Sequence, residues 1–117
     1  MTMLKYIYLV IFLILCAAFT VFHHGWSNYD QKKVLDYTGT IEESAFENPH
    51  CTARIKDKDK TWTVILAPPS RMNSRGAKAD MLKKGASVRV VGYPHLSIED
   101  EMRAERIFID GNKYELR

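Results

Sequence analysis

Hydrophobic and polar residues alternate along most of the chain after residue 36, with the period of two that is typical of half-buried β-strands. Five stretches show this alternation or a dense run of β-branched and aromatic residues: 37–46, 50–56, 61–67, 86–94 and 102–110. A sixth, short strand is expected after the turn signal Asp110-Gly111. The pattern therefore predicts a mainly β domain.

Two of these stretches contain a break in the alternation. Glu43 is a polar exception in the first. In the fifth, Met102 and Ala104 follow one register, whereas Ile107 and Ile109 follow the other. A shift by one residue predicts a β-bulge in the fifth strand.

Between the third and fourth strands, residues 70–85 lose the period of two. Apolar residues at 79, 81 and 82, followed by two lysines and Gly85, predict one short helix there. Because Gly76 interrupts the segment, only one turn or an irregular piece is expected before it. The resulting order, three strands, a helix and two further strands with a small last one, is that of the OB-fold. We therefore expect a small OB-like antiparallel barrel of five to six strands with one short helix, and an unrelated small barrel or sandwich is the competing interpretation.

The first 22 residues have a different pattern. Lys5 precedes an uncharged apolar run over residues 6–22, which is the layout of a secretory signal peptide. The same run, at the short end of what spans a bilayer, can instead stay as an N-terminal hydrophobic helix that anchors the protein, with Lys5 on the cytoplasmic side. We divide the chain into this segment (1–22), a linker (23–36) and the barrel domain (37–117). Both alternatives export the domain, to the periplasm or to the periplasmic face of the inner membrane.

Charge and cysteine content narrow the class of protein. The formal net charge is only +3, and acidic and basic residues are interspersed, which argues against a nucleic-acid partner. Cys16 lies in the apolar run and Cys51 in the domain, so no disulfide is available within the folded part. The alternation places Cys51 in the core and His50 on the outside. A thiol–imidazole pair is therefore not expected.

Histidines are the candidate metal ligands. In an OB-like barrel, the loops between strands one and two and between strands four and five flank the ligand-binding face, and they contain His50 and His95. Imidazole suits zinc and copper. We therefore expect a copper or zinc site at this rim, with His50 and His95 as ligands and His23 or His24 of the linker contributing. Ordinary solvated histidines are the alternative, since no metal-finger spacing occurs.

The remaining candidates concern partners rather than catalysis. No nucleophile elbow, P-loop or HExxH motif occurs, so we expect a binding module and not an enzyme. The alternative to metal binding is a structural or interaction domain that docks on an envelope protein through the same rim or through the basic residues Arg71, Arg75 and Lys78. Trp26 follows the apolar run closely and is expected at the membrane–water interface if that run is retained.

Five motifs, read in order, resemble a bacterial exported family of small domains of unknown function, the domain-of-unknown-function family 6152. They are HHGWSNYD, GTIEESAFENPH, TWTVILAPPSRM, LKKGASVRVVGYP and EMRAERI with a following DG. The resemblance implies an envelope location and a small β-rich domain, and it brings no catalytic or ligand residues. In that family the signal peptide usually ends just before the two histidines. Here TVF precedes His23, which offers no clean cleavage site.

Overall fold

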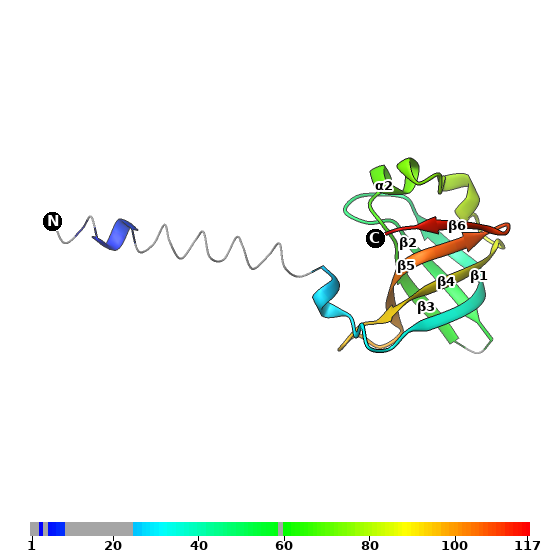
Figure 1. Ribbon diagram of the computed structural model, residues 1–117, viewed down its shortest axis with the longest axis horizontal. Helices are drawn as coiled ribbons and strands as arrows, with labels where there is room; N and C mark the ends of the chain where they lie inside the picture. Colours follow the sequence, from blue (N-terminus) through cyan, green and yellow to red (C-terminus); the bar gives the residue numbers. More distant parts are fainter. Residues whose placement is uncertain (1–2, 4, 9–24, 59) are drawn as a thin grey trace.

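The computed structural model describes residues 3, 5–8, 25–58 and 60–117 of the chain, and within them six strands form one sheet that closes on itself (Figure 1). The strands are β1 (Leu35–Ala45), β2 (Thr52–Asp57), β3 (Lys60–Ile65), β4 (Ser87–Pro94), β5 (Glu101–Ile109) and β6 (Asn112–Glu115). The prediction of a mainly β domain is confirmed, and β1 to β5 each lie within two residues of their expected bounds.

The strands close into a ring of five. Neighbours in the order β3-β2-β1-β4-β5-β6 are antiparallel, and β3 also pairs in parallel with β5 through Thr63 to Ile65 and Glu101 to Arg103. This last pairing joins the two ends of the sheet, so β1, β2, β3, β5 and β4 form a closed barrel. β6 is an extra strand on the outer edge of β5.

Both breaks in the alternation are bulges. The register between β1 and β2 shifts between Ile41 and Glu43. In the pairing of β4 with β5, Val91 lies opposite Arg106 and Gly92 opposite Ala104, which leaves Glu105 as the extra residue. The predicted bulge in the fifth strand is therefore confirmed, and it lets the apolar residues on both sides of Glu105 face the core.

The strands of the ring each contribute a buried aliphatic side chain to one core. Ile41, Ile55, Val64, Val90 and Ile107 come from β1, β2, β3, β4 and β5, and each is at most 1% exposed. Residues between β3 and β4 close the core with Met72 and Leu82.

The helical segment differs from its prediction. The α-helix is α2 (Pro69–Ser74), before Gly76, whereas the expected helix near residue 80 is a short 3-10 turn, η2 (Ala79–Leu82). Pro69 occupies a first-turn position of α2, where its fixed φ and missing N–H are tolerated. Both pieces lie at the edge of the barrel away from the β2–β3 turn (Figure 1).

Little of the predicted N-terminal hydrophobic helix belongs to the described residues. Residues 3 and 5–8 are helical and exposed, while 9–22 and the two histidines that follow lie outside the described part of the chain. Among the residues that are described, no helix is both long and apolar enough to cross a bilayer.

Part of the segment expected to be a linker packs against the barrel. After the 3-10 turn η1 (Trp26–Asn28), Tyr29 forms an isolated antiparallel bridge with His95. The backbone N–H of Asp30 donates to the carbonyl oxygen of Pro94 at 2.8 Å, and the N–H of Leu96 donates to that of Asn28 at 2.9 Å. These bonds attach the segment to the end of β4 and to the loop after it.

Candidate functional site

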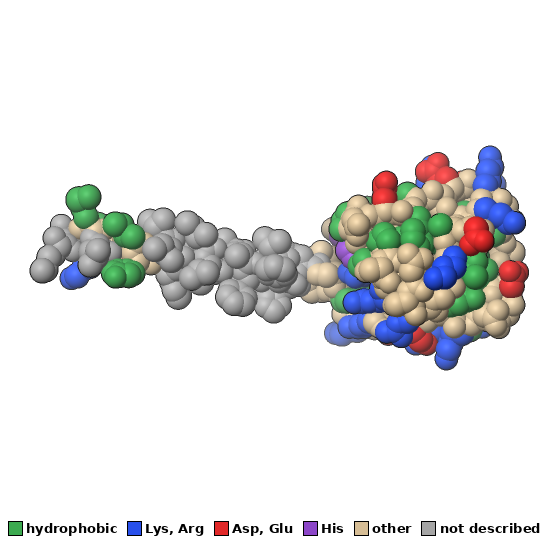
Figure 2. Space-filling view, turned by 90° about the horizontal axis from the view of Figure 1, so that it is seen from above, with side chains coloured by type: hydrophobic (Ala, Val, Ile, Leu, Met, Phe, Trp, Pro, Cys, Tyr) green, Lys and Arg blue, Asp and Glu red, His purple; other side chains and the backbone are tan. Residues whose placement is uncertain are grey.

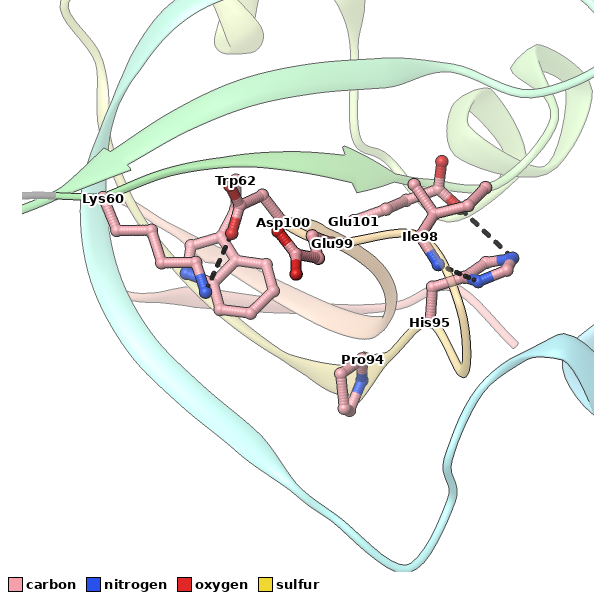
Figure 3. Close-up of a pocket in the computed structure, with 8 residues that line it drawn as sticks. All are labelled: Lys60, Trp62, Pro94, His95, Ile98, Glu99, Asp100 and Glu101. Carbon is pink, nitrogen blue, oxygen red and sulfur yellow. Dashed lines mark hydrogen bonds and ion pairs between the residues drawn. The ribbon is translucent and has the colours of Figure 1, made fainter.

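An open pocket of about 360 Å³ lies between the start of β3 and the loop that joins β4 to β5 (Figure 3). It combines an aromatic side chain, three carboxylates, a lysine and a histidine. The lining residues are Lys60, Trp62, Pro94, His95, Ile98, Glu99, Asp100 and Glu101.

Trp62 forms an aromatic wall of the pocket. Its ring stacks on that of Tyr37 from β1, with centroids 5.9 Å apart and planes inclined by 26°. The Lys60 ammonium lies 3.9 Å from the centroid of the Trp62 ring and 3.0 Å from Oδ1 of Asp100. The pocket therefore holds the chain's own cation between an aromatic face and a carboxylate, which are the two groups that commonly bind an amine.

The β4–β5 loop is braced by His95. Its Nδ1 accepts hydrogen bonds from the backbone N–H groups of Ser97, at 3.0 Å, and Ile98, at 2.9 Å. Because Nδ1 is an acceptor, the ring proton of the neutral form sits on Nε2, which lies 3.8 Å from Oε2 of Glu101. The same carboxylate oxygen accepts a hydrogen bond from the Tyr29 hydroxyl at 2.9 Å.

The N-terminal segment thus supports this side of the pocket. Burial raises the pKa of the Tyr29 hydroxyl, and its hydrogen bond to Glu101 raises it further, so the phenol remains a proton donor across the physiological pH range. Its ring packs edge to face on His95, with centroids 5.1 Å apart. Tyr29 therefore helps to hold the β4–β5 loop in place.

The predicted metal ligands have different surroundings. His95 packs in the loop, whereas Nε2 of His50 lies 3.4 Å from Nη2 of Arg103. Burial lowers the pKa of His50, and the charges of Arg103 and Arg71 lower it further, which marks a positive environment. No contact joins the two imidazoles, and His23 and His24 lie outside the described residues.

Within the described ranges, no group of three or more His, Cys, Asp or Glu side chains is arranged to hold a metal ion. Cys51 is fully buried beneath the neighbouring strands, and burial raises the pKa of its thiol. Its expected place in the core is confirmed. The metal site itself stays a prediction.

The predicted partner-binding residues lie on and after α2. Arg71, Arg75 and Lys78 are all exposed. Nη1 of Arg71 donates to the carbonyl oxygen of Leu116 at 3.3 Å, and Nζ of Lys78 donates to that of Asn73 at 3.1 Å. They form the basic side of this helical segment.

Trp26, expected at a membrane interface, packs against the barrel. The guanidinium carbons of Arg103 and Arg117 each lie 4.4 Å from the centroid of its ring, and Tyr93 meets it edge to face at 6.1 Å. Figure 2 shows basic side chains gathered on the domain beside the segment that leads to the N-terminus. Sequence reasoning had no partner for Trp26 because both arginines are remote in sequence.

Two functional features were missed, and one of them had a sequence signal. Lys60 and Trp62 are two residues apart in a strand, so the alternation already places them on one face. Asp100 joins them only because the backbone N–H of Thr63 donates to its carbonyl oxygen at 2.7 Å, where β3 meets the start of β5. Arg103, the other missed residue, becomes buried only because remote segments cover it.

The fold and the pocket define a small closed β-barrel domain with a lined depression at one end. Residues 12–101 match the family of unknown function DUF6152, which is most of the chain, and the protein therefore belongs to this family. The resemblance to this family of unknown function is thus confirmed, whereas its description as bacterial and exported stays a prediction. No curated protein matches the sequence.

Proposed function

We propose that the protein is an exported, non-enzymatic binding module built on an OB-like barrel. The support for this topology is the ring order β1-β2-β3-β5-β4, with a helical segment between β3 and β4. The β4–β5 loop, which flanks the ligand-binding face of OB-folds, lines the pocket. The N-terminal apolar run supports export to the periplasm or anchoring in the inner membrane.

The pocket is proposed to bind a lysine or arginine side chain of an envelope protein. The observation that carries this proposal is the position of the Lys60 ammonium, 3.9 Å from the centroid of the Trp62 ring and 3.0 Å from Asp100. A partner's cation would take the same position. Glu99 and Glu101 add two further carboxylates to the lining, so the local charge favours a cation despite the positive net charge of the chain.

Displacement of Lys60 is not costly. The side chains of Lys60 and Asp100 are 48% and 56% exposed, and an ion pair this accessible to water contributes little stability. A partner would also bring backbone and apolar contacts to Pro94 and Ile98, which line the same pocket. The position of the Lys60 ammonium is therefore available to an amine of a partner protein.

The test is a titration of the full chain, in a neutral detergent, with a short amidated peptide that has one lysine between glycines. We expect saturable binding with a Kd of about 1 mM, equivalent to about −4 kcal/mol, as for a single charged anchor on an exposed site. The same peptide with glutamate in place of lysine serves as the control and should not bind. Equal binding of both peptides, or of neither, would contradict the proposal.

A transition-metal role is the second candidate, because Nε2 of His95 and Oε2 of Glu101 lie 3.8 Å apart in the pocket. For Nε2 to bind a metal, the ring proton would have to move to Nδ1, which would break the hydrogen bonds that Nδ1 accepts from Ser97 and Ile98. Imidazole and carboxylate are common zinc ligands, and the missing ligands would come from the two histidines of the N-terminal segment or from His50, which does not line this pocket and would have to leave its contact with Arg103. Titration with zinc and with copper should then give a Kd below about 0.1 mM that His95→Ala weakens at least about tenfold. Weaker binding, or binding that His95→Ala leaves unchanged, rules this candidate out.

A further inference from the structure

The guanidinium of Arg103 is buried on the outer side of β5 without an anionic partner. The residue is 9% exposed, and its Nε has no hydrogen-bond partner in the part of the chain that the structure describes. Among the described residues, no carboxylate lies within 4 Å of it, although every other arginine or lysine that pairs with an acid does so at the surface. A buried cation without an anion is costly, so this position calls for an explanation.

The surroundings of Arg103 are positive as well. Burial lowers its pKa, and the charges of Arg71 and Arg117 also lower it, against an opposing effect from Tyr29. Arg103 and Arg71 in turn lower the pKa of His50. Four basic groups from β5, α2, the C-terminal residue and the loop before β2 thus share one region.

The acidic residue nearest to this group is already engaged. Oε1 of Glu105 lies 3.8 Å from Nη1 of Arg117, but Oε2 of the same carboxylate accepts from the Tyr93 hydroxyl at 2.9 Å and lies 3.6 Å from Arg106. The Glu105 carboxylate therefore forms ion pairs with Arg106 and Arg117 and does not lie within ion-pair distance of Arg103.

The Trp26 ring covers one flat face of the Arg103 guanidinium, but it does not bind the N–H groups at the edge of the group. The ring covers Cζ at 4.4 Å, which satisfies the flat face through a cation–π interaction. The N–H groups point outward in the plane of the guanidinium. Among the described residues, Nε has no partner and Nη2 has only the 3.4 Å contact with His50. These two nitrogens form the fork that binds oxyanions in a bidentate way.

We propose that Arg103, Arg71 and His50 form an oxyanion site that takes a phosphate group. The site is separate from the pocket beside Trp62 and does not depend on the function proposed there. The phosphate can belong to a soluble phosphate ester or to a phospholipid headgroup, since Trp26 leads directly into the N-terminal apolar segment. Both sources present the same oxygens to the fork of Arg103.

The test follows the Nε–H resonance of Arg103 in the full chain, labelled with ¹⁵N-arginine and kept in a phosphate-free sugar detergent. Inorganic phosphate is added at constant ionic strength, with sodium chloride as the balancing salt. We expect a saturable shift of the Arg103 resonance and a rise in the pKa of His50, because the anion offsets the charges that now lower it. No saturable shift would overturn the proposal.

Matched variants at Arg71 on α2 and at Arg75, the residue after it, distinguish a binding site from general attraction of anions. Arg71→Met should weaken phosphate binding about tenfold, whereas Arg75→Met removes the same charge from the same segment and should leave it unchanged. Arg103→Met should abolish phosphate binding. If that variant does not fold, the comparison of Arg71→Met with Arg75→Met still tests the proposal. Equal weakening of phosphate binding by Arg71→Met and Arg75→Met would show nonspecific electrostatic attraction and would contradict the proposal.

The source of the phosphate is settled by competition. Phosphatidylglycerol is added to the detergent micelles in the presence of inorganic phosphate. Displacement of inorganic phosphate assigns the site to a lipid headgroup, whereas saturation by inorganic phosphate without displacement assigns it to a soluble ester.

Discussion

Replacement of Gly92 by alanine is expected to destabilise the barrel by about 3 kcal/mol, the upper end of the usual cost of overpacking. A Cβ at this position would lie 2.0 Å from the carbonyl oxygen of Arg103 and 2.8 Å from Cα of Ala104. Both atoms belong to the backbone of β5, which is held on its other side by β3 and β6. The clash therefore cannot be relieved by rotation of a side chain.

The location of Gly92 makes the effect larger. It follows the register shift between Val91 and Gly92, where Glu105 is accommodated as the extra residue of β5. Glycine is needed here because two backbones approach closely at the bulge. A small domain has about 5–15 kcal/mol of stability in total, so this one methyl group would remove a large fraction of it.

Urea unfolding of the full chain in detergent measures this loss, with Gly85→Ala as the control. Gly85 has a φ of +90°, and no atom lies within 4 Å of where its Cβ would be. Gly85→Ala should lower the free energy of unfolding only by the backbone cost of an L-residue in the left-handed region, about 1–2 kcal/mol. A loss at Gly92 no larger than that at Gly85 would be inconsistent with the close approach of β4 and β5.

Replacement of Trp62 by leucine is expected to weaken binding of the lysine peptide about tenfold. The indole contributes a cation–π contact and an apolar wall, and the loss of about 1.4 kcal/mol corresponds to this factor. Leucine retains much of the apolar volume, so the barrel should keep its stability. The affinity for the peptide, measured by titration calorimetry, is the readout.

Phe108→Leu is the matched control for this prediction. Phe108 is also a half-buried aromatic under a basic side chain, with the guanidinium carbon of Arg89 at 4.7 Å from its ring centroid, but it does not line the pocket. Phe108→Leu should leave the affinity for the lysine peptide unchanged. Similar losses in both variants would mean that the peptide binds aromatic surface in general.

The parts of the fold that were predicted correctly are those with a local signal. Strands alternate polar and apolar residues, and the displaced alternation from Met102 to Ile109 revealed the bulge in β5. The helix was misplaced because the apolar residues at 79, 81 and 82 gave the visible local signal, whereas the α-helix begins at Pro69.

The site was harder to predict because it depends on long-range pairings. His50 and His95 both lie in the loops where they were expected, yet their neighbours come from elsewhere: Arg103 for the first, and Tyr29 with Glu101 for the second. Arg103 lies between the buried Met102 and Ala104, so the alternation of the strand alone gives no reason for its burial. Its burial follows from the packing of Trp26 against it, which no local pattern encodes.

The measurement that most directly tests the central proposal is the affinity of the lysine peptide for Lys60→Ala, compared with Lys56→Ala. Both lysines are exposed, and the two neighbouring strands β2 and β3 carry one each. If Lys60 occupies the position of a partner's cation, its removal should strengthen binding at least about threefold more than removal of Lys56 does. Equal changes in the two variants, or weaker binding by Lys60→Ala, would contradict the assignment of this pocket to a basic side chain.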